Sequence, residues 1–459
     1  MIFSAKKVNF LYKPAFFSIM RILILTMFKE GLGGGAGRVP FDMARALSRK
    51  NDVALICPGD RTGILSREGR LTIFSIKANI RGNLSAVKWS KKTLSRFNSF
   101  IKNFNPDVIH ANDFIDIDIY GMLYAIEHDI PFFYTGHVLP SKCLEFSMPN
   151  ILAPASRWLE RTTLKRYLTE FFRHCDGIVA LNRHSYMDHA RFCDRKKVYI
   201  IPNGKDIKRY EKIPIARLKG RKTLLFIGFL SDRKNQAFLV EAMRYLPREY
   251  KLVLIGSELH LGYLRKLKRM CSEYGLENVE FTGEVEYKKI PSCIATSHLF
   301  VSASLMEVQS LVVLEAMASG RAVVGLKNET ISELIDGKNG IALSRNTSPR
   351  RFAGAVRKVL EQNEDSYRRM CIRARESVRN FDWDVVEKKL KKMYAESARN
   401  YKHEEAGELM EFYKKVNLSF SAIVNSVLSL EKSAMVQIAH AKRNRYLLRI
   451  RKAISQKYR

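Results

Sequence analysis

Short apolar segments alternate with helical patterns along most of this chain. In the first half these segments are often β-branched, and they predict buried strands at residues 21–27, 52–57, 72–76, 107–110, 132–136, 177–181 and 198–202. Helical patterns lie between most of them. Because alternation of strands and helices is typical of a parallel sheet covered on both faces, we predict a Rossmann-like α/β domain here.

The second half repeats this alternation. Its apolar segments predict strands at residues 223–228, 251–256, 278–282, 298–303, 322–325 and 340–343. A turn-rich join, Pro202-Asn203-Gly204, separates the halves and places the domains at residues 1–205 and 206–382. We therefore expect two doubly wound α/β domains that face each other across a cleft. Beyond residue 381 the pattern predicts helix to the end of the sequence.

One strand–loop–helix unit of the second half, residues 298–320, carries two carboxylates. Glu307 lies in the loop and Glu315 in the helix, so both can face a cleft at the carboxyl edge of the sheet. Open α/β folds bind their ligands at that edge. The helix begins near Ser310 and Leu311, and its free backbone N–H groups suit a diphosphate.

The first domain offers a glycine loop and two histidines at the same edge. The loop, residues 31–38 with Gly35 in it, follows the first predicted strand and lets the backbone approach a ligand closely. His110 and His137 each follow a later strand. Neutral imidazole can hydrogen-bond a hydroxyl group without carrying a permanent charge, so both histidines are candidate ligand contacts.

Two cations follow the first strand of the second domain. Residues 227–235 read Ile-Gly-Phe-Leu-Ser-Asp-Arg-Lys-Asn, which resembles the G-R-L-x-x-x-K segment of retaining GT-B glycosyltransferases of the family-4 type. Lys234 matches the family's diphosphate-binding lysine, whereas Phe229 stands where the family usually has arginine. Arg233 either supplies the missing cation, since guanidinium suits phosphate, or marks a solvent-facing helix start.

The carboxylates Glu307 and Glu315 resemble the E-x7-E segment of the same family. The resemblance implies that Glu307 binds hydroxyls of the donor sugar, that Glu315 binds the nucleotide ribose, and that His137 lies beside the donor sugar. The donor-binding residues that it implies are Gly35, Arg233, Lys234, Gln309, Ser310, Leu311 and Glu315. Transfer of this type retains the anomeric configuration and requires neither a metal ion nor another cofactor. Residues 383–400 resemble the family's closing helix, which returns to the first domain, and the pattern of this sequence predicts a basic helical tail at residues 401–459.

Two details resemble diacylglycerol glucosyltransferases within that family. Residues 136–140, Gly-His-Val-Leu-Pro, are similar to their T-x-H-x-x-P segment, and residues 307–311 are similar to their E-x-Q-S segment. This resemblance implies transfer of a hexose from a nucleotide sugar such as UDP-glucose to a membrane lipid such as diacylglycerol. A polysaccharide or a polyprenyl-linked acceptor is the alternative within the enzyme class.

The charge of the chain predicts a polyanionic partner. Lys and Arg number 79 against 46 Asp and Glu, a formal net charge of +33. A degenerate core that binds nucleic acid is the rival interpretation, but it gives Glu307, Glu315 and Lys234 no reason to occur together. We favour an anionic membrane surface, because residues 157–173 combine basic and aromatic side chains and residues 442–459 are basic without an acidic residue.

Other features indicate a peripheral protein on the cytoplasmic face of a membrane. The sequence has no run of 18 or more apolar residues, and its 7 scattered cysteines suggest reduced thiols. Nothing in the sequence specifies an oligomeric state. The Asp116-x-Asp118 pair resembles the metal motif of GT-A enzymes, but apolar neighbours and the paired domains argue against that role. His184 and His189 are five apart, off a common helical face, and predict a surface helix.

Overall fold

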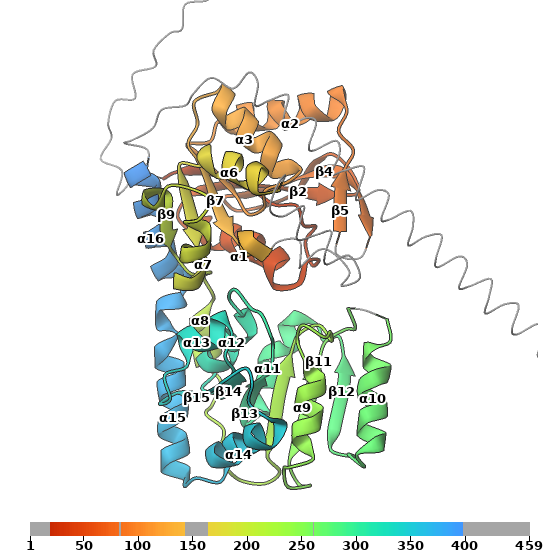
Figure 1. The fold of residues 1–459 in the computed structure, drawn as a ribbon. Coiled ribbons are helices and arrows are strands. Elements are labelled where there is room, and N and C mark those ends of the chain that lie inside the picture. Colours follow the sequence, from red (N-terminus) through yellow and green to blue (C-terminus); the bar gives the residue numbers. More distant parts are fainter. Residues whose placement is uncertain (1–18, 82–83, 143–163, 260, 398–459) are drawn as a thin grey trace, which may run out of the picture.

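The computed structural model describes residues 19–81, 84–142, 164–259 and 261–397. Within these residues the chain forms two α/β domains, one above the other in Figure 1, joined along one side by the chain crossings and by the long C-terminal helices. Each domain has one mostly parallel sheet with helices on both faces. The predicted fold class, two doubly wound Rossmann-like domains, is therefore confirmed.

The sheet of the first domain has the strand order β3-β4-β2-β1-β6-β7-β8-β9, and β5 pairs with β4. Its strands are β1 (Arg21–Leu25), β2 (Asp52–Gly59), β3 (Gly63–Glu68), β4 (Leu71–Arg81), β5 (Leu84–Val87), β6 (Val108–Ala111), β7 (Phe132–Gly136), β8 (Gly177–Ala180) and β9 (Val198–Ile200). One face is covered by α2 (Lys91–Phe104), α3 (Ile117–Glu127) and α6 (Lys165–Arg173). The other is covered by α1 (Gly34–Leu47) and by the last described helix, α16 (Trp383–Ser397).

The sheet of the second domain has the order β12-β11-β10-β13-β14-β15 and is parallel throughout. Its strands are β10 (Thr223–Ile227), β11 (Lys251–Ile255), β12 (Val279–Gly283), β13 (Leu299–Ser302), β14 (Ala322–Leu326) and β15 (Gly340–Leu343). The helices on one face are α9 (Gln236–Met243), α10 (Tyr263–Glu273) and α14 (Pro349–Leu360). Those on the other are α8 (Ile207–Glu211), α11 (Ile290–Ala295), α12 (Leu311–Ala318) and α13 (Glu329–Leu334), with α15 (Glu364–Ser377) reaching both groups.

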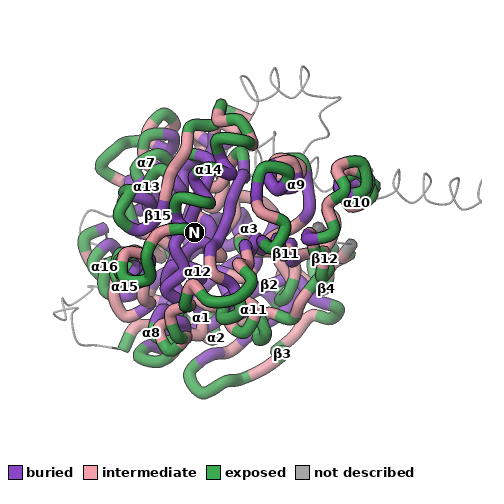
Figure 2. Tube along the Cα trace, turned by 90° about the horizontal axis from the view of Figure 1, so that it is seen from below, coloured by how far each residue is buried: buried purple, intermediate pink, exposed green. Residues whose placement is uncertain are grey.

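The burial of each strand explains whether the apolar pattern of the sequence predicted it. Each predicted strand coincides with an observed strand to within a few residues, because the central strands are apolar on both faces. The strands β3 and β5 were missed. Both run antiparallel to β4, and the residues of β3 are mostly exposed, so this strand at the rim of Figure 2 lacks an apolar pattern.

The two crossings between the domains lie side by side. Lys205 N–H donates to Phe381 O at 2.7 Å, and Trp383 N–H donates to Lys205 O at 3.2 Å. From this bridge, α16 returns to the first domain and packs Trp383, Leu390 and Tyr394 into its core. The second domain is therefore inserted between β9 and α16 of the first.

One membrane prediction is wrong for the residues that the structure describes. Leu168, Phe171 and Phe172 of α6 were expected to form part of an interfacial surface, but all three pack into the core of the first domain with exposures of 1%, 0% and 0%. Residues 157–163 and 401–459 lie outside the described residues. Among the described helices, none is long and apolar enough to cross a membrane.

Candidate active site

The centre of the candidate site lies on two neighbouring strands of the second sheet. Lys234 follows β10 and Glu307 follows β13, and these strands pair directly. Because parallel strands present their carboxyl ends at one edge, the two side chains meet there. The Lys234 ammonium forms an ion pair with Glu307 Oε1, and the side chains retain exposures of only 13% and 12%. A cation and a carboxylate thus stand together, largely shielded from water but not sealed off.

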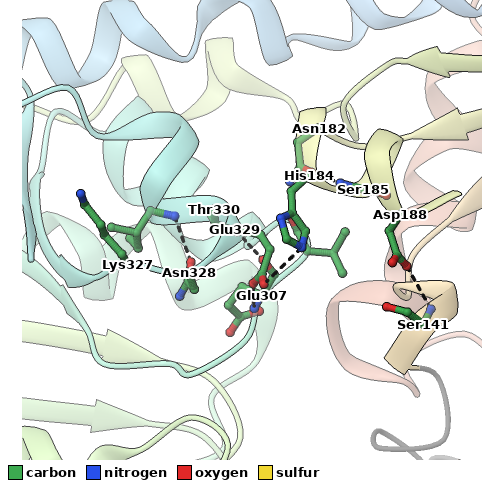
Figure 3. A network of polar contacts seen from close by, with 12 residues as sticks. Ser141, Asn182, His184, Ser185, Asp188, Glu307, Lys327, Asn328, Glu329 and Thr330 are labelled. Carbon is green, nitrogen blue, oxygen red and sulfur yellow. Dashed lines mark hydrogen bonds and ion pairs between the residues drawn. The ribbon is translucent and has the colours of Figure 1, made fainter. Parts of the chain in front are cut away.

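The loop that carries Glu307 is held by residues at the start of α13. Glu329 Oε2 accepts from Glu307 N–H at 3.1 Å. The Thr330 hydroxyl accepts from Ser310 N–H at 2.9 Å and donates to Glu307 O at 3.3 Å. These contacts fix the backbone on both sides of the Glu307 side chain, and Figure 3 shows Glu329 and Thr330 close to it.

The glycine loop of the first domain faces the second domain at this site. A Cβ on Gly35 would lie 3.8 Å from Leu311 Cδ1, so the helix starts of α1 and α12 approach each other. A Cβ on Gly34 would lie 2.8 Å from the Phe229 ring, at a positive φ of 60°. Phe229, which replaces the expected arginine, therefore packs against the glycine loop. Arg233 extends toward the Glu307 loop, with Nη1 3.5 Å from Met306 O.

Glu315 lies in a buried network that joins the two domains. It is 1% exposed, and its Oε1 lies 2.8 Å from Lys205 Nζ and accepts from the Tyr287 hydroxyl at 2.7 Å. Lys205 Nζ also lies 3.5 Å from Asp42 of α1, and Arg38 of the same helix stacks 3.3 Å above the Tyr287 ring.

The carboxylates of this network stabilise the positive charge of Lys205. Burial opposes the charge of Lys205, yet Glu315 and Asp42 raise the pKa of its ammonium overall. Glu315 Oε2 has no hydrogen-bond partner among the described residues, and neither has the buried Nε2 of Gln309, whose Oε1 accepts from Asn203 N–H at 2.7 Å. Both atoms are therefore buried polar groups whose hydrogen-bonding capacity is unsatisfied by the described residues.

The two candidate histidines have different surroundings. His110 is fully buried, with its nitrogens 2.6 Å from the Tyr394 hydroxyl and 2.7 Å from Thr135 Oγ1, so it is a core residue. His137 is partly exposed, and its Nε2 lies 3.1 Å from Asn112 Oδ1. Burial lowers the pKa of His137 to about 4, so it is neutral near pH 7.

The possible metal ligands of the sequence are engaged elsewhere. Asp116 accepts from Val87 N–H and from the Trp89 indole, and Asp118 accepts from Asn112 N–H at 3.1 Å. Burial, followed by the neighbouring Asp113, raises the pKa of Asp118 well above its usual range. The prediction of a surface helix is wrong for His189, which is fully buried, whereas His184 is exposed.

Sequence reasoning missed several residues of the site. Lys205 directly follows the predicted turn at residues 202–204 but was given no role, and its partner Glu315 lies far away in sequence. Asn182, His184 and Glu329 were also missed, because the contacts that bring them to the site link residues far apart in sequence.

Two family models match adjacent stretches of the chain, each along one domain. Glycosyltransferase Family 4 matches residues 33–209, and Glycosyl transferases group 1 matches residues 208–377. The chain therefore belongs to the glycosyltransferases of the GT-B type.

Curated relatives and solved structures agree with this membership. The chain is 27% identical over 271 residues to an alpha-monoglucosyldiacylglycerol synthase of Streptococcus pneumoniae, covering 55% of this chain and 58% of that protein. It is 28% identical over 265 residues to an uncharacterized glycosyltransferase of Methanocaldococcus jannaschii, covering 55% and 60%. These matches span less than two thirds of the relatives' length.

The fold is similar to solved glycosyltransferase structures. Anabaena Alr3699/HepE in complex with UDP and glucose has a TM-score of 0.64 at 18% identity, covering 82% of this chain and 100% of that one. Sucrose-phosphate synthase from Thermosynechococcus elongatus has a TM-score of 0.66 at 18% identity, covering 83% and 100%. At this identity the likeness establishes the fold alone.

Proposed function

We propose that this protein is a retaining, metal-independent glycosyltransferase that moves a hexose from a nucleotide sugar to a membrane lipid such as diacylglycerol. The observation that carries the proposal is the Lys234–Glu307 pair at the junction of the domains, on the neighbouring strands β10 and β13. The lipid acceptor is supported by the likeness to the alpha-monoglucosyldiacylglycerol synthase and by the segments at residues 136–140 and 307–311.

The diphosphate of the donor binds at Lys234 and the helix start at Ser310 and Leu311. Arg233 supplies the positive charge that the family's arginine would provide at the position of Phe229. The Arg233 side chain already extends to the Glu307 loop. When the donor enters, Lys234 turns from Glu307 to the diphosphate, and Glu307 then binds hydroxyls of the sugar. The role of these groups is to stabilise the negative charge that grows on the leaving group.

Two further donor contacts come from the network and from the first domain. Glu315 and Gln309 contribute their unpaired atoms, Oε2 and Nε2, to the nucleotide. Gly35 allows close approach of the glycine loop, and neutral His137 hydrogen-bonds the sugar.

Transfer takes place on one face of the sugar. The bond between the anomeric carbon and the diphosphate oxygen breaks, and the acceptor oxygen bonds to the same carbon from the same side. The proton of the acceptor hydroxyl passes to the leaving diphosphate, so the reaction demands no separate side-chain base. The protein holds the acceptor hydroxyl on the same face of the sugar as the leaving diphosphate and excludes water.

The experiment that tests the proposal is a transfer assay with a panel of radiolabelled nucleotide sugars, including UDP-glucose, and mixed vesicles that contain diacylglycerol. We expect label in the organic-extractable lipid, unchanged by a chelator, and an α-linked product from an α-linked donor. Label that appears only in a water-soluble polymer or on polyprenyl phosphate would show that the acceptor is instead a polysaccharide or a polyprenyl-linked molecule. RNA binding without transfer from any donor would contradict the proposal.

Membrane attachment is tested with the same vesicles. We propose a peripheral location on the inner, anionic face, supported by the net charge of +33. Sedimentation with anionic vesicles should decrease at high salt and should be absent with neutral vesicles. Equal binding to both kinds of vesicle would contradict an electrostatic attachment.

A further inference from the structure

The start of helix α7 (Arg183–His189) in the first domain makes one contact with the Glu307 loop of the second domain and one with Glu329 at the start of α13. At its start, Asn182 Nδ2 donates to Val308 O at 2.6 Å, and Asn182 is 1% exposed. Two residues further on, His184 Nε2 lies 3.8 Å from Glu329 Oε1. Figure 3 shows His184 directed at Glu329, with Glu307 beside them.

Both contacts converge on the backbone that flanks Glu307. Glu329, which faces His184 through Oε1, accepts from Glu307 N–H through Oε2, and its side chain is only 3% exposed. Asn182 holds the carbonyl of the next residue, Val308. On one side of Glu307, Glu329 belongs to the second domain and is also contacted by Arg345 Nη2 at 3.4 Å, whereas on the other side the Val308 carbonyl is held by Asn182 of the first domain.

Packing adds to these polar contacts. The Val308 side chain is 6% exposed and belongs to the apolar cluster of the first domain, together with Leu139, Leu181 and Ile201. A residue from the candidate site of one domain is therefore seated in the core of the other. If the domains part, this contact, the Asn182 hydrogen bond and the His184 contact are all lost together.

We propose that Asn182 is a positioning residue for Glu307, which places that carboxylate for transfer only when the two domains are closed. This inference rests on the proposed function, because it gives domain closure a specific consequence at the donor sugar. An open cleft can bind a nucleotide through the second domain and keeps the contacts of Glu329 and Thr330 with the Glu307 loop, but it lacks the hydrogen bond from Asn182 to Val308. Sugar is then transferred only from the closed arrangement, which protects the donor from water.

Asn182 caps α7 and also contacts two groups of the second domain, the carbonyl of Val308 and the carboxyl of Glu333. Its Oδ1 accepts from Ser185 N–H at 2.8 Å and caps α7, whereas its Nδ2 makes the contact with Val308. Serine is also a good N-cap but cannot reach Val308. Asn182→Asp is avoided, since the Asn182 amide interacts with the carboxyl of Glu333 and a second carboxylate there would repel it.

The chain offers a matched control. Asn363 is the N-cap of α15, where its Oδ1 accepts from Ser366 N–H at 2.8 Å in the same Asn-x-x-Ser arrangement. It is exposed and lies in a helix that does not carry the site. Asn363→Ser therefore reproduces the change of cap without the contact to Val308.

The first measurement is hydrogen exchange of the backbone amides in residues 304–311, which needs no active enzyme. In Asn182→Ser these amides should exchange about tenfold faster than in Asn363→Ser, because they open when the loop is released. His184→Ala, an exposed position that should fold normally, should give a smaller change in the same direction. Equal exchange in all variants overturns the proposal, even if the wild-type protein transfers no sugar from any donor.

The second measurement is a double-mutant cycle with UDP-glucose as donor. Asn182→Ser should lower kcat about tenfold while the Kd for UDP changes less than about twofold, since the diphosphate contacts are in the second domain. In a Glu307→Gln background the same substitution should cost less than about twofold, because Asn182 acts through Glu307. A full tenfold loss in that background would assign Asn182 a merely structural role and overturn the proposal. Absence of any transfer by the wild-type protein would instead count against the proposed function.

Discussion

The two sheet edges that face each other use their polar residues differently. In the first domain, His110 and Asp118 end inside the core, where their partners are other groups of the protein. In the second, Lys234 and Glu307 keep part of their surface open and pair mainly with each other. A polar residue after a parallel strand is thus no evidence of binding by itself, because it can equally serve to satisfy a buried loop. What distinguishes the second edge is a concentration of charge that the fold alone does not require.

The largest expected effect is on the free energy of unfolding, and it comes from the buried pair of Lys205 and Glu315. Lys205→Met leaves Glu315 as an uncompensated buried charge, so the free energy of unfolding should fall by about 3–5 kcal/mol in a urea titration. The double variant Lys205→Met/Glu315→Gln should recover most of this loss. Lys208→Met removes a lysine whose side chain is 69% exposed, so the free energy of unfolding should stay close to that of the wild type. If Lys205→Met also left the free energy of unfolding close to that of the wild type, this would contradict a buried ion pair between Lys205 and Glu315.

The next effect is on catalysis, and it compares the two edges directly. Glu307→Gln and Lys234→Met should each lower kcat/KM for UDP-glucose at least about 100-fold, or about 2.7 kcal/mol, while melting temperatures stay close to that of the wild type. His110→Gln in the first domain should stay within about threefold of wild-type activity, because His110 contacts only core residues. If His110→Gln were as damaging as Glu307→Gln, the contrast between the edges would be lost.

A smaller effect concerns the contact between the edges. Gly34→Ala should lower the free energy of unfolding by about 2 kcal/mol, since a Cβ there meets the Phe229 ring and the backbone has a positive φ. Gly31→Ala is the control. Its φ is 86° but no atom lies within 4 Å of the added Cβ, so it should cost only the backbone strain, about 1 kcal/mol.

Equal losses in the two glycine variants would mean that Phe229 does not press on the glycine loop. If the contact is real, Gly34→Ala/Phe229→Ala should behave more like Gly31→Ala than the single variant does. The free energies of unfolding of the wild type, Gly34→Ala, Gly31→Ala and Gly34→Ala/Phe229→Ala are measured by urea titration under the same conditions.

The smallest effect is the pH dependence that the buried edge confers. Burial, and then His137, lowers the pKa of His110 to about 3, so the unfolded chain binds one more proton between that pH and about 6.5. Stability from His110 is therefore lost as the pH falls through this window. Between pH 6.5 and 5.5 the wild type should lose about 1 kcal/mol relative to His110→Gln. Parallel pH profiles of the two proteins would show that His110 is not held neutral.

Most of the fold could be predicted because the central strands are apolar on both faces. The pattern at residues 132–136 and 340–343 gave the observed bounds of β7 and β15. It failed at β3, where exposed antiparallel pairing leaves no apolar signature, and at α6, where aromatic residues suited a membrane surface and a core equally well.

Residues of the candidate site could be predicted where a short segment of the sequence is enough to recognise them. Lys234, Glu307 and Ser310 follow strands or begin a helix, and such positions can be recognised from a short segment. Asn182 and Lys205 could not be recognised in this way. Their partners, Val308 and Glu315, are more than a hundred residues away, and only the packing of one domain on the other brings them together.

The insertion of the second domain between β9 and α16 has a consequence for synthesis on the ribosome. The core of the first domain includes Tyr394, which reaches His110 across 284 residues of sequence. At about 5–20 residues per second, roughly 10–40 s separate the emergence of β9 from that of α16. The second domain has all its strands, and can fold, only towards the end of that interval, whereas the first domain exposes the apolar groove that α16 later fills throughout it. Nascent chains of this protein should therefore engage chaperones through their N-terminal half until the last described helix has left the exit tunnel.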